Sequence, residues 1–542
     1  MGNPADLLPP NRAMLGRGSL WTMIPKPVRI GYNASSFSRH YFGRIGWGSN
    51  SMRRLVIGFF ACLLLSPCVA RADILYYDVG GLEFRFEGKA KVDSGRTVMF
   101  RHPRFGTFYF GYDDVKFYKA PSTLSICKRK LGKAKDDPKA CIEAARWALH
   151  HGLLDDFYKA ASMAWHLDKN DPTVQRLARL KRKMNAPVPI YKEQEEEMIK
   201  YLPGHKNMEF IRSDHFLLMH NTDGDYAKET SSSKKRGKKS KTVVADERLE
   251  LLEKVYESFL LKFYLEGLEV ELPKKRLKVV LFADRSDFLA YCESTDAGRA
   301  SAAGLYDKRS NIAVFYNQGT HEGFKGLDRA KKQLAELADE AKRVRSPSTA
   351  QLVRMAKSFD LLSKVAKLNQ DIEVVSHECT HQMAANTGLQ PNESAVPVWV
   401  AEGIATYFES PKEAAWAGIG TVNESRLSLY RQNAGDTARS NVEYIVSDDV
   451  FMKARSHEEV LNAYSQAWAL NHFLMAHHFD KLMKYYQLLA KRKAKVGKMF
   501  PPEKNIAAFK KIFGDDLKTL NAQWRRYMRD LKTDVERVVD GE

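Results

Sequence analysis

Apolar and polar positions alternate in the first periodic part of the chain. Residues 82–86 alternate strictly, and residues 97–100 and 107–110 are rich in aromatic and β-branched side chains, with glycines between the runs. A period of two interrupted by glycine turns is typical of short strands. The pattern predicts a small β module over residues 73–120.

The period changes to that of an amphipathic helix over residues 136–186. Alanine, leucine and aromatic side chains recur at helical spacing on both sides of Gly152. The pattern predicts a helical hairpin and resembles one tetratricopeptide-like unit. A single unit cannot form a free-standing array, so we expect it to pack against its neighbours.

Residues 188–542 mix both periods and predict an α+β domain. Buried strands are expected in three short apolar runs, at 215–220, 277–282 and 311–316. A long amphipathic pattern at 246–265 predicts a helix.

The charged pattern at 323–370 predicts an inserted helical hairpin ahead of a separate, shorter helix. Everything after Glu409 is expected to be helical.

That shorter helix contains the sequence H-E-x-x-H. Residues 371–387 carry apolar positions at helical spacing before Gly388, which predicts a helix of about 15 residues. His377 and His381 then lie on one face, where two imidazoles can bind one Zn²⁺. Glu378 would lie beside the ion and could accept a proton from the attacking water.

A catalytic zinc site needs a third protein ligand, and Glu402 is placed to supply it. Pro397 precedes a second predicted helix, and Glu402 falls on the first turns of that helix. The loop after His381 is long enough to turn the second helix back against the first. Glu409 lies two turns beyond Glu402, so both cannot easily bind one ion. Glu393, in the loop, is expected to be solvated.

H-E-x-x-H at 377–381 followed by W-x-x-E-G-x-A-x-Y-x-E at 399–409 resembles the gluzincin zinc metallopeptidases of the M1-like clan. The resemblance implies that His377, His381 and Glu402 bind zinc and that Glu378 is the general base and acid.

The chain departs from the M1 pattern in two ways. The gap between the second histidine and the glutamate is longer. The G-x-M-E-N segment that anchors a substrate amine is missing. Aminopeptidase activity is therefore not expected. Residues 214–531 are more similar to a poorly characterised bacterial envelope family with an H-E-x-x-H domain.

A peptidase also needs a hydrogen-bond donor for the tetrahedral oxyanion. Residues 464–475 predict a helix with Tyr464 and His472 on one face. Related gluzincins take this donor from a helix after the glutamate helix, which implies Tyr464, with His472 as second choice. The alternative is that both are core residues.

The resemblance also implies an edge strand that binds the substrate backbone by strand addition. Residues 304–316 lie in the corresponding position, although an ordinary sheet strand would give the same pattern.

The N-terminal residues predict export. Residues 1–51 lack periodicity and are interpreted as an over-extended or disordered start. Residues 52–72 have a basic beginning, an apolar run and an A-x-A ending, which predicts a signal peptide cut before Asp73. The apolar run is too short to span a membrane, so no transmembrane span is expected in the mature chain. A retained N-terminal anchor is the alternative.

The formal net charge is +20, and its distribution bears on the partners. Residues 1–72 hold nine Lys and Arg against one acid, and six more basic residues fall in 234–241. The basic loop 229–243 is expected to be solvated and could contact anionic lipid or wall polymer. An exported chain without a nucleic-acid module is not expected to bind nucleic acid.

Cysteine use is low. Four cysteines remain after the predicted signal peptide: Cys127, Cys141, Cys292 and Cys379. They form no C-x-x-C pair, so a structural Cys₄ zinc site is not expected. Cys379 is expected to pack as a small buried side chain, and Cys127 could pair with Cys141 in an oxidising compartment.

These patterns lead to one main expectation and two alternatives. The expectation is a zinc-dependent peptidase of the endopeptidase kind, in the periplasm, the cell envelope or the extracellular space. Its partners would be a protein or peptide substrate and an envelope component. The alternatives are a catalytically idle, gluzincin-like binding protein and a zinc amidase with a non-protein substrate.

Overall fold

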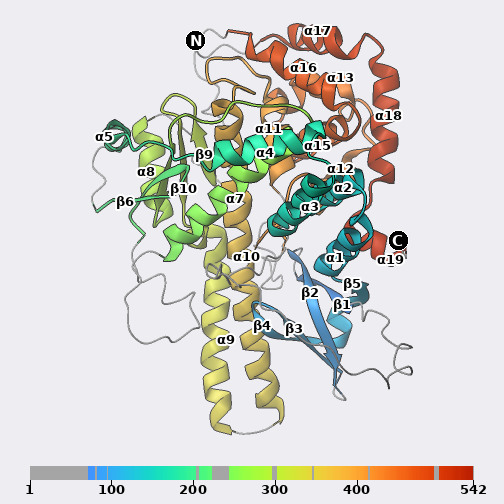
Figure 1. The fold of residues 1–542 in the computed structure, drawn as a ribbon. Coiled ribbons are helices and arrows are strands. Elements are labelled where there is room, and N and C mark those ends of the chain that lie inside the picture. The colour runs from blue at the N-terminus through green and yellow to red at the C-terminus, as the bar shows by residue number, and fades with distance from the viewer. Residues whose placement is uncertain are drawn as a thin grey trace, which may run out of the picture.

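The computed structural model describes residues 71–540 apart from 80–81, 94–95, 203–206, 223–242, 296–301, 345–346, 410, 413–414 and 494–499. The predicted start, nearly all of the predicted signal peptide and almost the whole basic loop lie outside the described residues. As predicted, the fold is α+β, with two five-stranded sheets among many helices (Figure 1). Within the described ranges, no helix is long and apolar enough to cross a membrane.

The first sheet forms the predicted β module, with the strand order β4-β3-β2-β1-β5 and antiparallel pairing throughout. Its strands are β1 (Arg71–Val79), β2 (Leu82–Val92), β3 (Thr97–His102), β4 (Gly106–Gly111) and β5 (Val115–Pro121). The short helix η1 (Tyr112–Asp114) joins the last two. Because side chains alternate along each strand, one face of the sheet is buried, and Phe86, Phe100 and Phe108 are fully enclosed there.

Helices follow the β module: α1 (Thr123–Ala134), α2 (Pro138–His150), α3 (Leu154–Leu167), α4 (Pro172–Met184) and α5 (Lys192–Lys200). Gly152, with φ +70°, makes the turn between α2 and α3. The expected hairpin is in fact three helices, because Asp171 accepts hydrogen bonds from the backbone of Thr173 and Val174 and so caps α4. These helices share a core with the rest of the chain, as expected.

The second sheet has the order β6-β7-β8-β10-β9. Its strands are β6 (Glu209–Arg212), β7 (Phe216–His220), β8 (Leu277–Phe282), β9 (Gly304–Asp307) and β10 (Ile312–Tyr316). The three central strands are parallel, and the two edge strands are antiparallel to their neighbours. Side chains alternate between a core shared with α7 (Val243–Leu265) and one shared with α8 (Arg285–Thr295), so the central strands are buried on both faces.

The helical hairpin predicted ahead of the H-E-x-x-H helix is not separate from it. After η2 (Gln318–Thr320) and η3 (Glu322–Phe324), the chain forms α9 (Lys325–Val344) and then α10 (Pro347–Asn386), one helix of 40 residues. The expectation of a separate helix of about 15 residues was therefore wrong. No glycine or proline occurs between Pro347 and Gly388 to interrupt the helix. Gly388, with φ +75°, follows its C-terminal end, as predicted.

Helix α10 connects the β module with the part of the molecule that holds the second sheet and the C-terminal helices (Figure 1). Its N-terminal half contributes Leu362, Val365 and Ala366 to the core of the β module. Ser358 Oγ accepts a hydrogen bond of 2.7 Å from the backbone N–H of Tyr109 in the same module. Its C-terminal half packs against α7, β9 and β10.

The rest of the chain is mainly helical and forms a cluster beside α10. The elements are α11 (Val398–Phe408), β11 (Pro411–Lys412), β12 (Ala415–Trp416), α12 (Glu424–Asn433), α13 (Val442–Val446), α14 (Asp449–Met452), α15 (His457–His477), α16 (Phe479–Ala490), α17 (Pro502–Phe513), α18 (Leu517–Asp530) and α19 (Asp534–Val539). The two short strands depart from the expectation of an entirely helical region. Trp399, Trp468 and Trp524 are fully buried within the cluster.

The contact between the β module and α10 can be tested by stability. Leu362→Ala removes a buried side chain from the shared core and should lower the free energy of unfolding by about 2–5 kcal/mol. Met355 lies on the same helix but is 51% exposed, so Met355→Ala is the matched control and should have little effect. Denaturant unfolding measures both. Equal effects of the two changes would contradict the described interface.

Candidate metal centre

Two imidazoles of α10 face the same point. His377 and His381 are one helical turn apart, and their Nε2 atoms lie 3.1 Å from each other. Ser376 and Thr380 on the neighbouring face are buried, and their hydroxyls donate hydrogen bonds to backbone carbonyls of the preceding turn. That bonding lets a polar stretch of helix be enclosed.

Helix α11 brings Glu402 to the two histidines. Asp448 accepts hydrogen bonds of 2.9 and 3.0 Å from the backbone N–H groups of Val398 and Trp399, which caps the start of α11. Gly403 allows a close approach to α15, since a Cβ there would lie 3.0 Å from the carbonyl oxygen of Ala467. The position of Glu402 therefore follows from a cap at one end and a close helix contact beside it.

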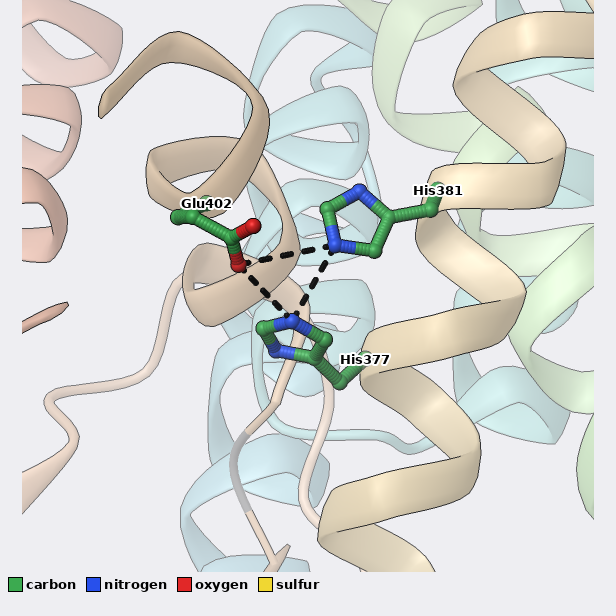
Figure 2. A group of neighbouring side chains, drawn as sticks. All are labelled: His377, His381 and Glu402. Atoms are coloured by element: carbon green, nitrogen blue, oxygen red, sulfur yellow. Dashed lines mark hydrogen bonds and ion pairs between the residues drawn. The ribbon is translucent and has the colours of Figure 1, made fainter. Parts of the chain in front are cut away.

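The three predicted ligands converge on one point (Figure 2). Glu402 Oε2 lies 3.1 Å from His377 Nε2 and 3.5 Å from His381 Nε2. Ligand atoms at about 2.0–2.1 Å from a tetrahedral ion would be separated by about 3.3–3.4 Å. The spacing and the donor set of two imidazole nitrogens and one carboxylate therefore fit three corners of a tetrahedron around a divalent ion.

Glu409, which the sequence analysis rejected as a ligand, orients His377. Its Oε2 accepts a hydrogen bond of 3.0 Å from His377 Nδ1, and the side chain is 2% exposed. A carboxylate can only accept, so Nδ1 carries a proton toward Glu409, and Nε2 is the nitrogen that faces Glu402 and His381. Partners of this kind fix the tautomer of metal-binding histidines.

Arg426 of α12 holds Glu409 in turn. Its Nε and one terminal nitrogen lie 2.9 and 2.7 Å from Glu409 Oε1, and the same terminal nitrogen is 3.5 Å from Glu373 Oε1. The pairing of Glu409 with Arg426 could not be predicted from the sequence, because no local spacing links α12 to the end of α11. The one available signal was the final glutamate of the W-x-x-E-G-x-A-x-Y-x-E run.

The electrostatics favour a cation at the centre. Burial acts to raise the pKa of Glu402, but His381 and His377 lower it well below its usual range, so the carboxylate stays ionised. Burial acts to lower the pKa of His377, but hydrogen bonds to Glu402 and Glu409 raise it well above its usual value. Positive charge, whether a proton or a metal ion, is therefore stabilised between these groups.

Glu378 lies between the centre and the edge strand β9. Burial is the main cause of the raised pKa of its carboxyl, which His377 and His381 partly offset. A Cβ on Gly304 would lie 3.4 Å from Glu378 Cγ and 2.6 Å from Val374 Cγ1, so only glycine fits against the helix there. A more basic carboxylate beside the outer edge of β9, where no described strand pairs, is suited to proton transfer.

Tyr464 of α15 also reaches the centre. Its ring centroid is 6.2 Å from that of His377, and the Arg426 guanidinium lies 5.5 Å from the Tyr464 centroid. Glu402 is the largest cause of a raised Tyr464 pKa, followed by burial, so the hydroxyl keeps its proton and can donate. The structure thus brings Tyr464 together with the other predicted residues.

His472 does not join this group, which corrects its choice as a second oxyanion donor. Its Nε2 donates to the Gly420 carbonyl oxygen at 3.1 Å, and its Nδ1 accepts from the Tyr527 hydroxyl at 2.8 Å. It lies about 12 Å further along α15 than Tyr464, which carries it away from His377. Burial lowers its pKa to about 4.

The cysteines contribute nothing to the centre. Cys127 and Cys141 are buried and unpaired in the structure, so the possible disulfide between them is not formed. Cys379 is fully buried and free, as predicted. Glu393 is exposed in its loop, also as predicted.

Residues 371–495 match a family described as "Protein of unknown function (DUF1570)". The match includes all the residues of the centre from Glu373 to Tyr464, and it leaves the β module and helices α1 to α9 outside. No curated protein matches the chain. The resemblance to gluzincins therefore stays a prediction that rests on the residues themselves.

The role of Glu409 can be tested by metal affinity. Glu409→Gln keeps the shape of the side chain but removes the charge that fixes the His377 tautomer. We expect the affinity for Zn²⁺ to fall by about 10–100-fold. Competition with a coloured chelator measures it, with the exposed Glu393→Gln as the matched control. Unchanged affinity in Glu409→Gln would show that Glu409 does not orient the ligand.

Proposed function

We propose that the chain is a zinc-dependent peptidase of gluzincin type. The observation that carries the proposal is the convergence of His377 Nε2, His381 Nε2 and Glu402 Oε2, with Glu378 beside them. Two imidazoles and a carboxylate form a ligand set typical of catalytic zinc sites, which keep a position open for water or substrate.

Zinc is the metal that best suits this donor set among the common divalent ions. Imidazole ligands disfavour Mg²⁺ and Ca²⁺, which prefer oxygen, and three ligands at tetrahedral spacing suit Zn²⁺. When bound, zinc would polarise a substrate carbonyl and make a nearby water more acidic.

The chain's own residues would carry the proton and hold the charge. Glu378 would take a proton from the attacking water and pass it to the leaving amine. Tyr464 would donate a hydrogen bond to the oxyanion that develops on the substrate carbonyl. Arg426 would keep Tyr464 and Glu409 in place through the contacts described above.

Strand β9 is the proposed substrate-binding edge. Gly304 to Asp307 pair with β10 on one side, and no described strand pairs with the other side. Gly304 faces the Glu378 side chain, since a Cβ there would lie 3.4 Å from Glu378 Cγ, and the backbone of Tyr306 hydrogen-bonds to the same carboxylate. An extended peptide added to this edge would bring its backbone past the proton-transfer group, which favours an endopeptidase.

We further propose that the protein acts after export, in the periplasm, the cell envelope or the extracellular space. Support comes from the signal-like pattern at 52–72 in the sequence. The substrate would then be an envelope or extracellular protein or peptide. Activity on a wall amide but on no peptide would favour an amidase instead.

Glu378→Gln tests the peptidase proposal. The amide cannot accept a proton, so hydrolysis of a casein or peptide-library substrate should fall by about 10²–10⁴-fold. Zinc content, measured by atomic absorption, should stay at the wild-type level because the three ligands are unchanged. A wild-type protein that binds zinc but hydrolyses no substrate would support the idle binding protein.

Tyr464→Phe tests the oxyanion donor. Loss of one donor should lower kcat by about 10²–10³-fold with little change in KM. Tyr444→Phe, on the neighbouring helix α13, is the control and should behave as wild type. If Tyr464→Phe keeps full kcat, Tyr464 is a packing residue and another group must serve the oxyanion.

A further inference from the structure

A cavity lies away from the metal centre. It has a volume of about 840 Å³, and none of the metal-centre residues lines it. Cavities of about 300–1,000 Å³ are typical of small-molecule sites. Its lining residues come mainly from α1, α2, α7, α11, α15, α16 (Phe479–Ala490), α18 and α19.

The cavity wall is rich in cations. Five basic side chains contribute: Lys130, Lys133, Arg146, Lys262 and Arg537. Only two carboxylates line it, Glu143 and Glu266.

The two least exposed cations are paired with the carboxylates of the lining. Glu266 Oε1 lies 3.0 Å from Lys262 Nζ and also bonds to Arg146 Nη1. The Lys262 side chain is only 15% exposed. Burial acts to lower the pKa of Lys262, but Tyr407 and Glu266 raise it, so the amine remains charged. Glu143 Oε1 also lies 3.4 Å from Arg146 Nε, so two carboxylates match these two cations. The three further cations of the lining give the cavity a net positive charge, which attracts an anion.

Aromatic side chains lie among the cations. Trp147, Tyr407, Phe479 and Tyr527 line the cavity, and Lys130 Nζ lies 5.6 Å from the Trp147 ring centroid. Tyr527 donates its hydroxyl to His472, so that histidine is neutral and fully bonded. The wall thus offers flat apolar surface next to the cations.

We propose that this cavity binds an organic phosphate, with the phosphate group against the cations and an apolar or aromatic body against the rings. Arg and Lys together are the usual partners of phosphate oxygens, and Arg can bind them in a bidentate manner. The aromatic side chains give a reason to prefer an organic ester over a free inorganic anion.

Binding in this cavity does not depend on the proposed zinc chemistry, although helices α11 and α15 contribute residues to both sites. On α11, Glu402 lies at the metal centre and Tyr407 lines the cavity. On α15, Tyr464 lies at the metal centre and His472 lines the cavity. Failure of peptidase activity would therefore not bear on the cavity, and failure of phosphate binding would not bear on the metal centre.

Phenyl phosphate is the probe, titrated into the full chain by calorimetry. We expect one site per chain and an affinity at least about tenfold above that of inorganic phosphate or phenol alone, because only phenyl phosphate can contact both the cations and the rings. Lys133→Ser/Arg537→Ser removes two exposed cations of the cavity and should weaken binding at least about tenfold.

The control is Lys128→Ser/Arg129→Ser, which removes two exposed cations of α1 that do not line the cavity. It should bind phenyl phosphate as wild type does. Equal weakening by both double variants, or no saturable binding to wild type, would overturn the proposal. Displacement by phosphatidate vesicles would identify a lipid headgroup as the source of the phosphate, and its absence would identify a soluble ester.

Discussion

The uninterrupted course of helix α10 is the constraint on which the rest of the structure depends. One helix of 40 residues forms part of the β-module core with its first half and presents His377 and His381 with its second half. The distance between the β module and the metal centre is therefore set by helical rise rather than by a flexible joint. The second sheet and the C-terminal helices then pack around the end that carries the two histidines.

The residues of the metal centre come from separate helices, which the fold brings together. Helix α10 gives two imidazoles and Glu378, α11 gives Glu402, α12 gives Arg426 and α15 gives Tyr464. Glu409 links them, since it bonds His377 on one side and Arg426 on the other. The buried charges are thus paired, which is the condition under which such charges can be enclosed. The same pairing fixes the nitrogen of His377 that faces the centre.

Much of this could be predicted from the sequence where local spacing decides the outcome. The i, i+4 histidines, the helix after Pro397 and the alternating strands of the β module depend on neighbouring residues, and the structure has them. The length of α10 does not follow from composition, because the change from charged to apolar residues near residue 370 resembles a helix boundary, although no helix breaker occurs there. Glu409, Arg426 and the position of His472 depend on contacts between distant helices, for which one sequence has no local signal.

The most direct test of the central claim is X-ray absorption at the zinc edge of protein purified with zinc. The account predicts one zinc per chain with nitrogen and oxygen neighbours at about 2.0–2.1 Å and the multiple-scattering pattern of two imidazoles. Loss of one imidazole from that pattern in His381→Ala would assign it to the predicted ligand. A protein without zinc, or a spectrum dominated by sulfur at about 2.3 Å, would contradict the claim.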